Sequence, residues 1–157
     1  MNDNLLPCVD PNIKTLGIRP VVARNEASTQ TAIKVRDHVL VSDKKDTDTG
    51  PTPLEICLDS LAGCEGVIFK RCAREMKFEY TGVDTEASSE VDQRGSRGVV
   101  DVRPFFNWVR LNKSVHTNEP KESIDRLGQN VEFRRLVMGL FHSANVQLDL
   151  TWKRVAI

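Results

Sequence analysis

The spacing of hydrophobic residues changes several times along the chain, and each change marks an expected element. Residues 20–42 have a strand-like pattern that alternates in part over residues 35–41, which puts Arg36 and His38 on one strand face. Beyond a polar loop at residues 43–50, apolar residues recur every three or four positions, which predicts a long helix with one apolar face. The apolar positions of this helix are Leu54, Cys57, Leu58, Leu61, Cys64, Ile68 and Cys72.

The long helix has a recognisable start and end. Thr52 is the expected N-cap, Pro53 suits the first helical position, and Glu55 completes a capping box with Thr52. Basic residues gather towards the far end, where the helix dipole favours positive charge. They are Lys70, Arg71, Arg74 and Lys77. We therefore expect the helix to run from Pro53 to about Met76.

The second half of the chain predicts strands and shorter helices. Residues 78–92 and 99–115 read as two strands of a hairpin, with a turn at residues 94–98. A helical region opens near Pro120, and Gly128 to Asn130 is expected to interrupt it, with Asn130 capping a further piece to about Phe141. Residues 146–155 close the chain as a strand. This order predicts an α+β fold with a mainly antiparallel sheet.

Length and charge narrow the class of protein. The chain has 157 residues, enough for a single domain over 1–157, in which the aperiodic residues 1–19 form an N-terminal arm. Its 22 basic and 22 acidic residues are spread without a strongly basic segment, so we expect no nucleic-acid partner. We expect no membrane association and a cytoplasmic location, because no apolar run reaches ~18 residues and no signal peptide is evident.

The long helix carries three of the four cysteines, and Cys64 has unusual neighbours. Gly63 and Gly66 flank it, although glycine inside a helix costs about 0.5–1 kcal/mol relative to alanine. Something must approach this turn closely, either another helix or a substrate. Cys57 and Cys72 are expected to be core residues. The cysteine spacings do not match a zinc site, and we expect no metal or organic cofactor.

A reactive thiol needs a neighbouring cation, because the thiolate is the nucleophile. Arg36 is the best candidate for this cation, and Glu55 could hold it in place. Both residues also have plain interpretations, Arg36 as an exposed strand residue and Glu55 as part of the capping box. The helix, apolar over most of its surface, needs cover on more than one side, which favours a partner subunit.

Two segments resemble a known family. Asp43, the run from Thr47 to Pro53 and the run from Leu61 to Cys64 are similar to the signature of the OsmC/Ohr family of osmotically inducible and organic hydroperoxide resistance proteins. The resemblance implies an intertwined homodimer built around one long central helix per subunit. It also implies that Cys64 is the peroxide-reducing cysteine and that Arg36 and Glu55 activate it. In the hydroperoxide-resistance branch the acid lies one residue earlier, where this chain has Leu54.

The resolving cysteine of the family is absent from this divergent chain. The corresponding segment, residues 131–136, reads VEFRRL and contains no thiol. The expected function is therefore reduction of organic hydroperoxides through one reactive cysteine that an external thiol recycles, in oxidative stress defence. The alternative is a non-catalytic dimer that binds a small apolar ligand at the subunit interface.

Overall fold

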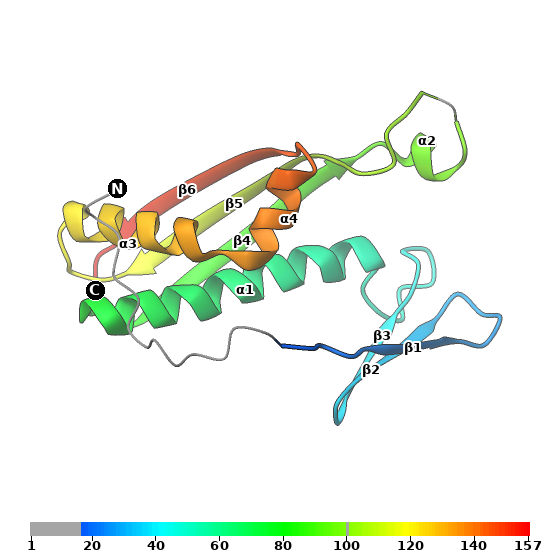
Figure 1. The fold of residues 1–157 in the computed structure, drawn as a ribbon, viewed down its shortest axis with the longest axis horizontal. Helices are drawn as coiled ribbons and strands as arrows, with labels where there is room; N and C mark the ends of the chain where they lie inside the picture. Colours follow the sequence, from blue (N-terminus) through cyan, green and yellow to red (C-terminus); the bar gives the residue numbers. More distant parts are fainter. Residues whose placement is uncertain (1–16, 100) are drawn as a thin grey trace. The chain divides into compact units, whose positions relative to one another are not determined.

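The computed structural model describes residues 17–99 and 101–157 (Figure 1). Cys8 and most of the expected N-terminal arm lie outside these residues. The described residues form two compact units, 17–58 and 59–157, and the division between them falls within the long helix α1. That residues 1–157 make a single domain stays a prediction.

The first unit contains a three-stranded antiparallel sheet. Its strands are β1 (Val22–Asn25), β2 (Thr31–Val35) and β3 (His38–Ser42), in the order β1-β2-β3. Val35 pairs with His38, so Arg36 lies in the two-residue turn between β2 and β3, with a φ of 56°. The prediction that Arg36 shares a strand face with His38 is therefore wrong, because the alternation of residues 35–41 is broken by a hairpin turn.

The loop after β3 leads into α1 through a close backbone contact. The backbone N–H of Asp43 donates to the carbonyl oxygen of Pro51 at 3.1 Å, and the Thr49 hydroxyl donates to the Asp43 carboxylate. These bonds bring Gly50 against Val41, where a Cβ would clash with the Val41 carbonyl oxygen. This contact explains why glycine stands at position 50.

Helix α1 (Pro53–Met76) has the predicted bounds and the predicted cap. The backbone N–H of Glu55 donates to the Thr52 hydroxyl oxygen at 3.3 Å, and Oε2 of Glu55 accepts from the Thr52 backbone N–H at 2.7 Å. This reciprocal pair is a capping box. Beyond the helix, Lys77 has a φ of 52°, the left-handed conformation that commonly ends a helix.

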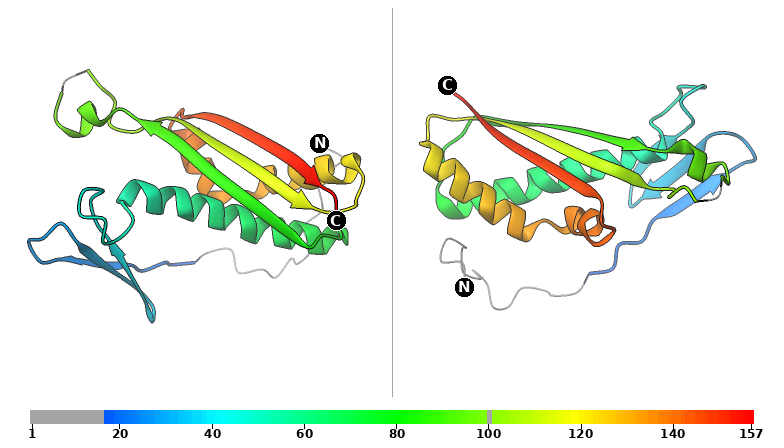
Figure 2. Two further views of the ribbon diagram at one scale, coloured as in Figure 1. Left: turned by 180° about the vertical axis from the view of Figure 1, so that it is seen from behind. Right: turned by 90° about the horizontal axis from the view of Figure 1, so that it is seen from above.

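The second unit is built on the sheet β4-β5-β6, with strands β4 (Gly82–Val91), β5 (Phe106–His116) and β6 (Gln147–Val155). β4 and β5 are antiparallel, whereas β6 runs parallel to β5. Figures 1 and 2 show α3 (Lys121–Arg134) and the part of α1 from Asp59 onward against one face of this sheet. The fold is the predicted α+β class, with three of the four strand pairings antiparallel.

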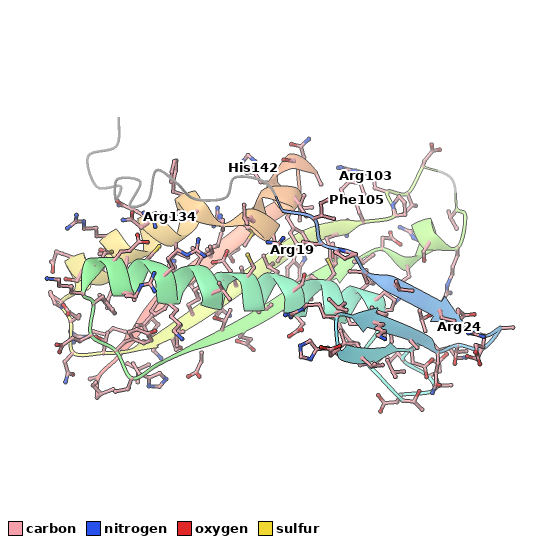
Figure 3. The ribbon with its side chains drawn as sticks, turned by 60° about the horizontal axis from the view of Figure 1, so that its bottom comes forward. Arg19, Arg24, Arg103, Phe105, Arg134 and His142 are labelled. Carbon is pink, nitrogen blue, oxygen red and sulfur yellow. The ribbon has the colours of Figure 1, made fainter. Side chains whose placement is uncertain are left out.

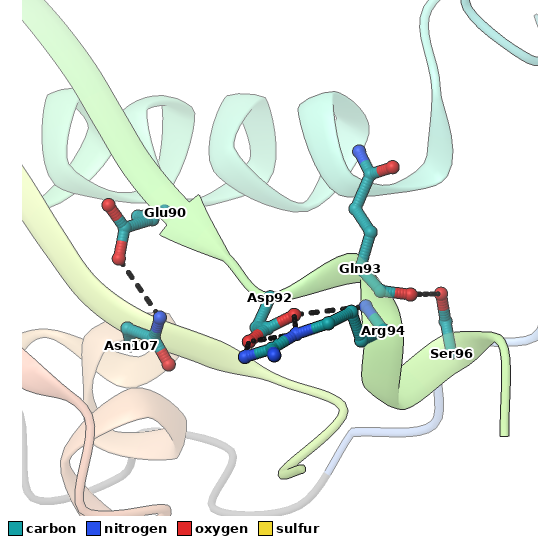
Figure 4. A network of polar contacts seen from close by, with 6 residues as sticks. All are labelled: Glu90, Asp92, Gln93, Arg94, Ser96 and Asn107. Atoms are coloured by element: carbon teal, nitrogen blue, oxygen red, sulfur yellow. Dashed lines mark hydrogen bonds and ion pairs between the residues drawn. The ribbon is translucent and has the colours of Figure 1, made fainter. Parts of the chain in front are cut away.

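The connection between β4 and β5 differs from the prediction. Residues 93–96 form the short helix α2 (Gln93–Ser96) instead of a simple turn, and β5 begins at Phe106 rather than at Val99. Asp92 caps α2 by accepting from the Arg94 backbone N–H at 3.0 Å and from the Arg94 guanidinium at 2.6–3.1 Å (Figure 4). These bonds lower the pKa of Asp92 to about 2.

The break between the last two helices also differs from the prediction. α3 continues without interruption through Gly128, and the chain leaves helical conformation at Arg135, before α4 (Leu136–Ser143). A Cβ at Gly128 would lie 3.3 Å from Trp152, so glycine serves close packing here and not a helix break. Asn130 is not a cap, since its side-chain amide donates to the Arg126 carbonyl oxygen at 2.9 Å within α3.

The core of this unit lies between α1, α3 and β5. Its most deeply buried members are Phe69, Cys72, Val115, Leu127 and Val131. The Phe69 ring stacks on Trp152, with 6.1 Å between ring centroids, and meets the Tyr80 ring edge to face at 5.0 Å. Aromatic contacts of this kind fix side chains more specifically than aliphatic packing does.

Candidate functional site

Cys64 lies on α1 at the boundary between the core and an open helix face. Its half-buried side chain packs against the core cluster. The buried residues Leu61 and Ile68 lie about one turn before it and one turn after it on the helix. The adjoining face carries Gly63 and Gly66, and a Cβ at either glycine would meet no described atom of residues 59–157 within 4 Å. The close approach that the glycines predict is therefore not made within this unit, and the face is open to a substrate or a second subunit.

Burial affects the thiols of the other two cysteines of α1. Cys72 is completely buried, and burial raises the pKa of its thiol, although the nearby Arg134 opposes the shift. Burial also raises the pKa of Cys57. The prediction that Cys72 is a core residue is confirmed, but the same prediction for Cys57 is wrong, since Cys57 is half-buried, as Cys64 is.

A pocket begins one helical turn beyond Cys64, in the same unit. Its volume is about 410 Å³, and it is lined by Val67, Lys70, Arg71, Arg74, Phe78 and Tyr80. Val67 is 62% exposed. The pocket lining is therefore partly apolar and partly basic.

Arg36 and Glu55 do not bond to one another in the described part of the chain. The Arg36 side chain is exposed, and no described residue forms a hydrogen bond or ion pair with it. Oε2 of Glu55 accepts from both the backbone N–H and the hydroxyl of Thr52, which together lower the pKa of Glu55. Among the described residues, Oε1 of Glu55 takes part in no hydrogen bond, so it keeps the capacity to accept one.

A buried ion pair that was not predicted from the sequence includes Glu65, the residue directly after Cys64. Lys113 on β5 donates through Nζ to Oε2 of Glu65, and their side chains are 2% and 0% exposed. Burial lowers the pKa of Lys113, and the carboxylate of Glu65 opposes that shift. The alternation of β5 contains the signal for this burial, because Lys113 shares a strand face with the buried Leu111 and Val115.

A second ion pair joins α1 to α3 farther along the helix. Nη1 of Arg134 lies 2.6 Å from Oε2 of Glu75, and both side chains are mostly buried. Figure 3 labels Arg134 at the end of α3, well separated from Arg103, whose guanidinium stacks on the Phe105 ring at 3.6 Å. The α1–α3 contact is thus held by charge as well as by apolar packing.

The described residues contain no group of three or more His, Cys, Asp or Glu side chains that could hold a metal ion. In residues 17–99 and 101–157, no helix is both long enough and apolar enough to span a membrane.

This chain is an α+β protein in which a long, capped helix packs on a small sheet and carries a half-buried cysteine. The family model described as OsmC-like protein matches residues 44–151, more than half of the chain, and the chain belongs to that family. No curated protein matches the sequence.

Solved structures show the same fold. The OsmC-like protein from Mycoplasma pneumoniae is 14% identical, with a TM-score of 0.80 over 88% of this chain and 98% of that one. The organic hydroperoxide resistance protein OhrB of Bacillus subtilis is 19% identical, with a TM-score of 0.62 over 87% and 98%. An organic hydroperoxide resistance protein from Legionella pneumophila is 14% identical, with a TM-score of 0.66 over 89% and 99%. At these identities the likeness shows the fold alone.

Proposed function

We propose that this protein is a cysteine-based peroxidase that reduces organic hydroperoxides through Cys64, in defence against oxidative stress. The observation that carries the proposal is the position of Cys64 on α1, half-buried beside an open glycine face and one turn from a pocket with a partly apolar lining. Family membership supports a peroxidase-like role, and several solved relatives are named for resistance to organic hydroperoxides. The apolar and aromatic residues of the pocket lining, Val67, Phe78 and Tyr80, suit the organic part of such a substrate.

The proposed reaction transfers one oxygen atom to sulfur. The Cys64 thiolate attacks the distal peroxide oxygen, so that an S–O bond forms while the O–O bond breaks. The sulfur is oxidised to a sulfenic acid, and the departing alkoxide takes a proton and leaves as an alcohol. Arg36 would stabilise the thiolate and orient the peroxide, and the unused Oε1 of Glu55 would accept from its guanidinium.

We expect recycling to use thiols from outside the chain, because residues 131–136, where the family resemblance implies the resolving cysteine, contain none. One external thiol condenses with the sulfenic acid, which releases water and leaves a mixed disulfide on Cys64. A second external thiol then attacks this disulfide, restoring Cys64 and leaving as the oxidised external disulfide. A cytoplasmic location would supply such thiols in reduced form.

The proposal includes a homodimer. One face of the β1-β2-β3 sheet exposes Val22, Val39 and Val41, and only Ser42 and Asp43 are buried among residues 17–58. A small sheet needs an apolar face packed against something to be stable, and a second copy of the chain would supply this cover. Sedimentation at micromolar concentration should show a dimer, whereas a well-behaved monomer would contradict this part of the proposal.

The decisive experiment compares cysteine variants. Cys64→Ser should abolish consumption of cumene hydroperoxide in the presence of dithiothreitol, while the matched variant Cys57→Ser, on the same helix, should retain it. Intact mass after mild peroxide treatment should show one added oxygen, assigned to Cys64 by peptide mapping. A folded protein whose Cys64 is never oxidised would refute the peroxidase and favour the alternative, a dimer that binds a small apolar ligand at its interface.

A further inference from the structure

Glu65 and Lys113 form the only fully buried ion pair among the described residues, and it reaches the helix turn that carries Cys64. Glu65 directly follows Cys64 on α1, and Lys113 lies in the middle of β5. A charge buried in this way is costly unless a partner of good geometry holds it. The presence of this ion pair therefore needs an explanation other than stability.

The surroundings of Lys113 hold its ammonium group in one place. Lys113 and Trp152 are register partners on the neighbouring strands β5 and β6, and Nζ lies 4.1 Å from a Trp152 ring centroid. The Trp152 ring is packed in turn against Phe69 and Gly128. Through Glu65, α1 is thus bonded at one defined point to a rigid part of the sheet.

The helix turn around Cys64 needs such a fixed point. Gly63 and Gly66 lack side chains, and no described atom of residues 59–157 would contact a Cβ at either position. The neighbouring anchors of α1, Leu61 and Ile68, make apolar contacts, which have little directional preference. A hydrogen-bonded ion pair is directional, so it restricts rotation of the helix about its axis in a way that apolar contacts do not.

We propose that Glu65 and Lys113 are positioning residues for Cys64. Their bond fixes the orientation of the glycine-flanked turn and therefore the direction in which the thiol points. The consequence for peroxide reduction rests on the proposed function, but the ordering of the turn does not. A misplacement of about 1 Å at a reacting atom can lower a rate by about a hundredfold.

The test replaces the ion pair by apolar residues of similar volume, Glu65→Leu with Lys113→Met, a change that buried ion pairs often tolerate without loss of stability. The matched control, Glu75→Leu with Arg134→Met, removes the second α1 ion pair, which lies away from Cys64. Glu65→Gln is the conservative variant, because its amide oxygen still accepts from Lys113. Hydrogen exchange of amides 64–68 is measured relative to amides 72–76 of the same helix, so that a general loss of stability leaves the ratio unchanged.

We expect this exchange ratio to rise about tenfold in the Glu65/Lys113 variant and to stay within about twofold in the control and in Glu65→Gln. Single-turnover oxidation of Cys64 by cumene hydroperoxide, followed by peptide mass, should fall at least about tenfold in the first variant alone. An unchanged exchange ratio, or an unchanged oxidation rate, would overturn the positioning role. If wild-type Cys64 is not oxidised at all, the proposed function fails, and the exchange ratio still decides whether the turn is ordered by this pair. Should the double variant not fold, Glu65→Gln with Lys113→Met, which also lacks the ion pair but leaves no buried charge, provides the same comparison.

Discussion

Lys113→Met alone would leave the Glu65 carboxylate buried without its counter-ion. The Glu65 side chain has no exposed area, and its other oxygen, Oε1, already has no partner among the described residues. Removing one member of a buried ion pair costs about 3–5 kcal/mol, because the remaining charge has neither water nor a counter-ion. Methionine fills most of the space of the lysine stem, so a cavity adds little. We expect a loss of about 3–5 kcal/mol in the free energy of unfolding.

A second substitution tests whether the charge causes this loss. Glu65→Gln added to Lys113→Met removes the stranded charge and leaves a neutral amide, which is far cheaper to bury. We expect the double variant to recover at least about half of the stability that Lys113→Met loses. Lost packing against Trp152 would remain in both variants, so recovery reports on the charge.

Urea unfolding followed by tryptophan fluorescence at pH 7.5 measures these differences. Protein concentration must be the same for all variants, because dissociation of a dimer would make apparent stability depend on it. The reasoning fails if Lys113→Met costs less than about 1 kcal/mol, which is the cost of an ordinary exposed ion pair. It also fails if Glu65→Gln brings no recovery.

Three further outcomes follow from the structure. Thr52→Ala should lower the free energy of unfolding by about 1 kcal/mol, through loss of the capping box, and a value near zero in urea unfolding would show that the cap is unimportant. Phe69→Ala should cost about 3–5 kcal/mol, because Phe69 is 1% exposed and contacts three aromatic rings; full stability in the same assay would contradict this packing. Because burial raises the pKa of Cys72, iodoacetamide at pH 8 should modify it only after unfolding, and rapid labelling of the folded protein would disprove its burial.

Elements with local causes could be predicted from the sequence. The start of α1 depends on Thr52 and Glu55, which lie within one turn of each other, and its length follows from the spacing of its apolar residues. The strands of the second half were also found, since each alternates over many residues. The family resemblance rests on short segments that lie close together in the sequence, and the family is confirmed.

Features with long-range causes could not be predicted. Gly128 was expected to break a helix, but the Trp152 ring that requires glycine there lies on strand β6. In the loop before β5, Gly95 lies against Pro104, where a Cβ at Gly95 would lie 2.9 Å from the Pro104 backbone, and no local pattern predicts this approach. Burial of Lys113 is visible in the alternation of β5, but its pairing with Glu65 spans 48 residues, and no local pattern reveals it.

In the proposed reaction, the missing resolving cysteine and the open face of α1 both favour recycling of Cys64 by an external thiol. Val131, where the family would have a thiol, is completely buried and belongs to the core against which Cys64 packs. An apolar side chain there stabilises the core but has no thiol that could form a disulfide with an oxidised Cys64. In the proposed reaction the external thiol then approaches Cys64 from outside the core. The absence of side chains at Gly63 and Gly66 leaves room on that side. A cysteine that is reduced by an external thiol requires such an opening, whereas a cysteine that is reduced by a resolving cysteine of its own chain does not.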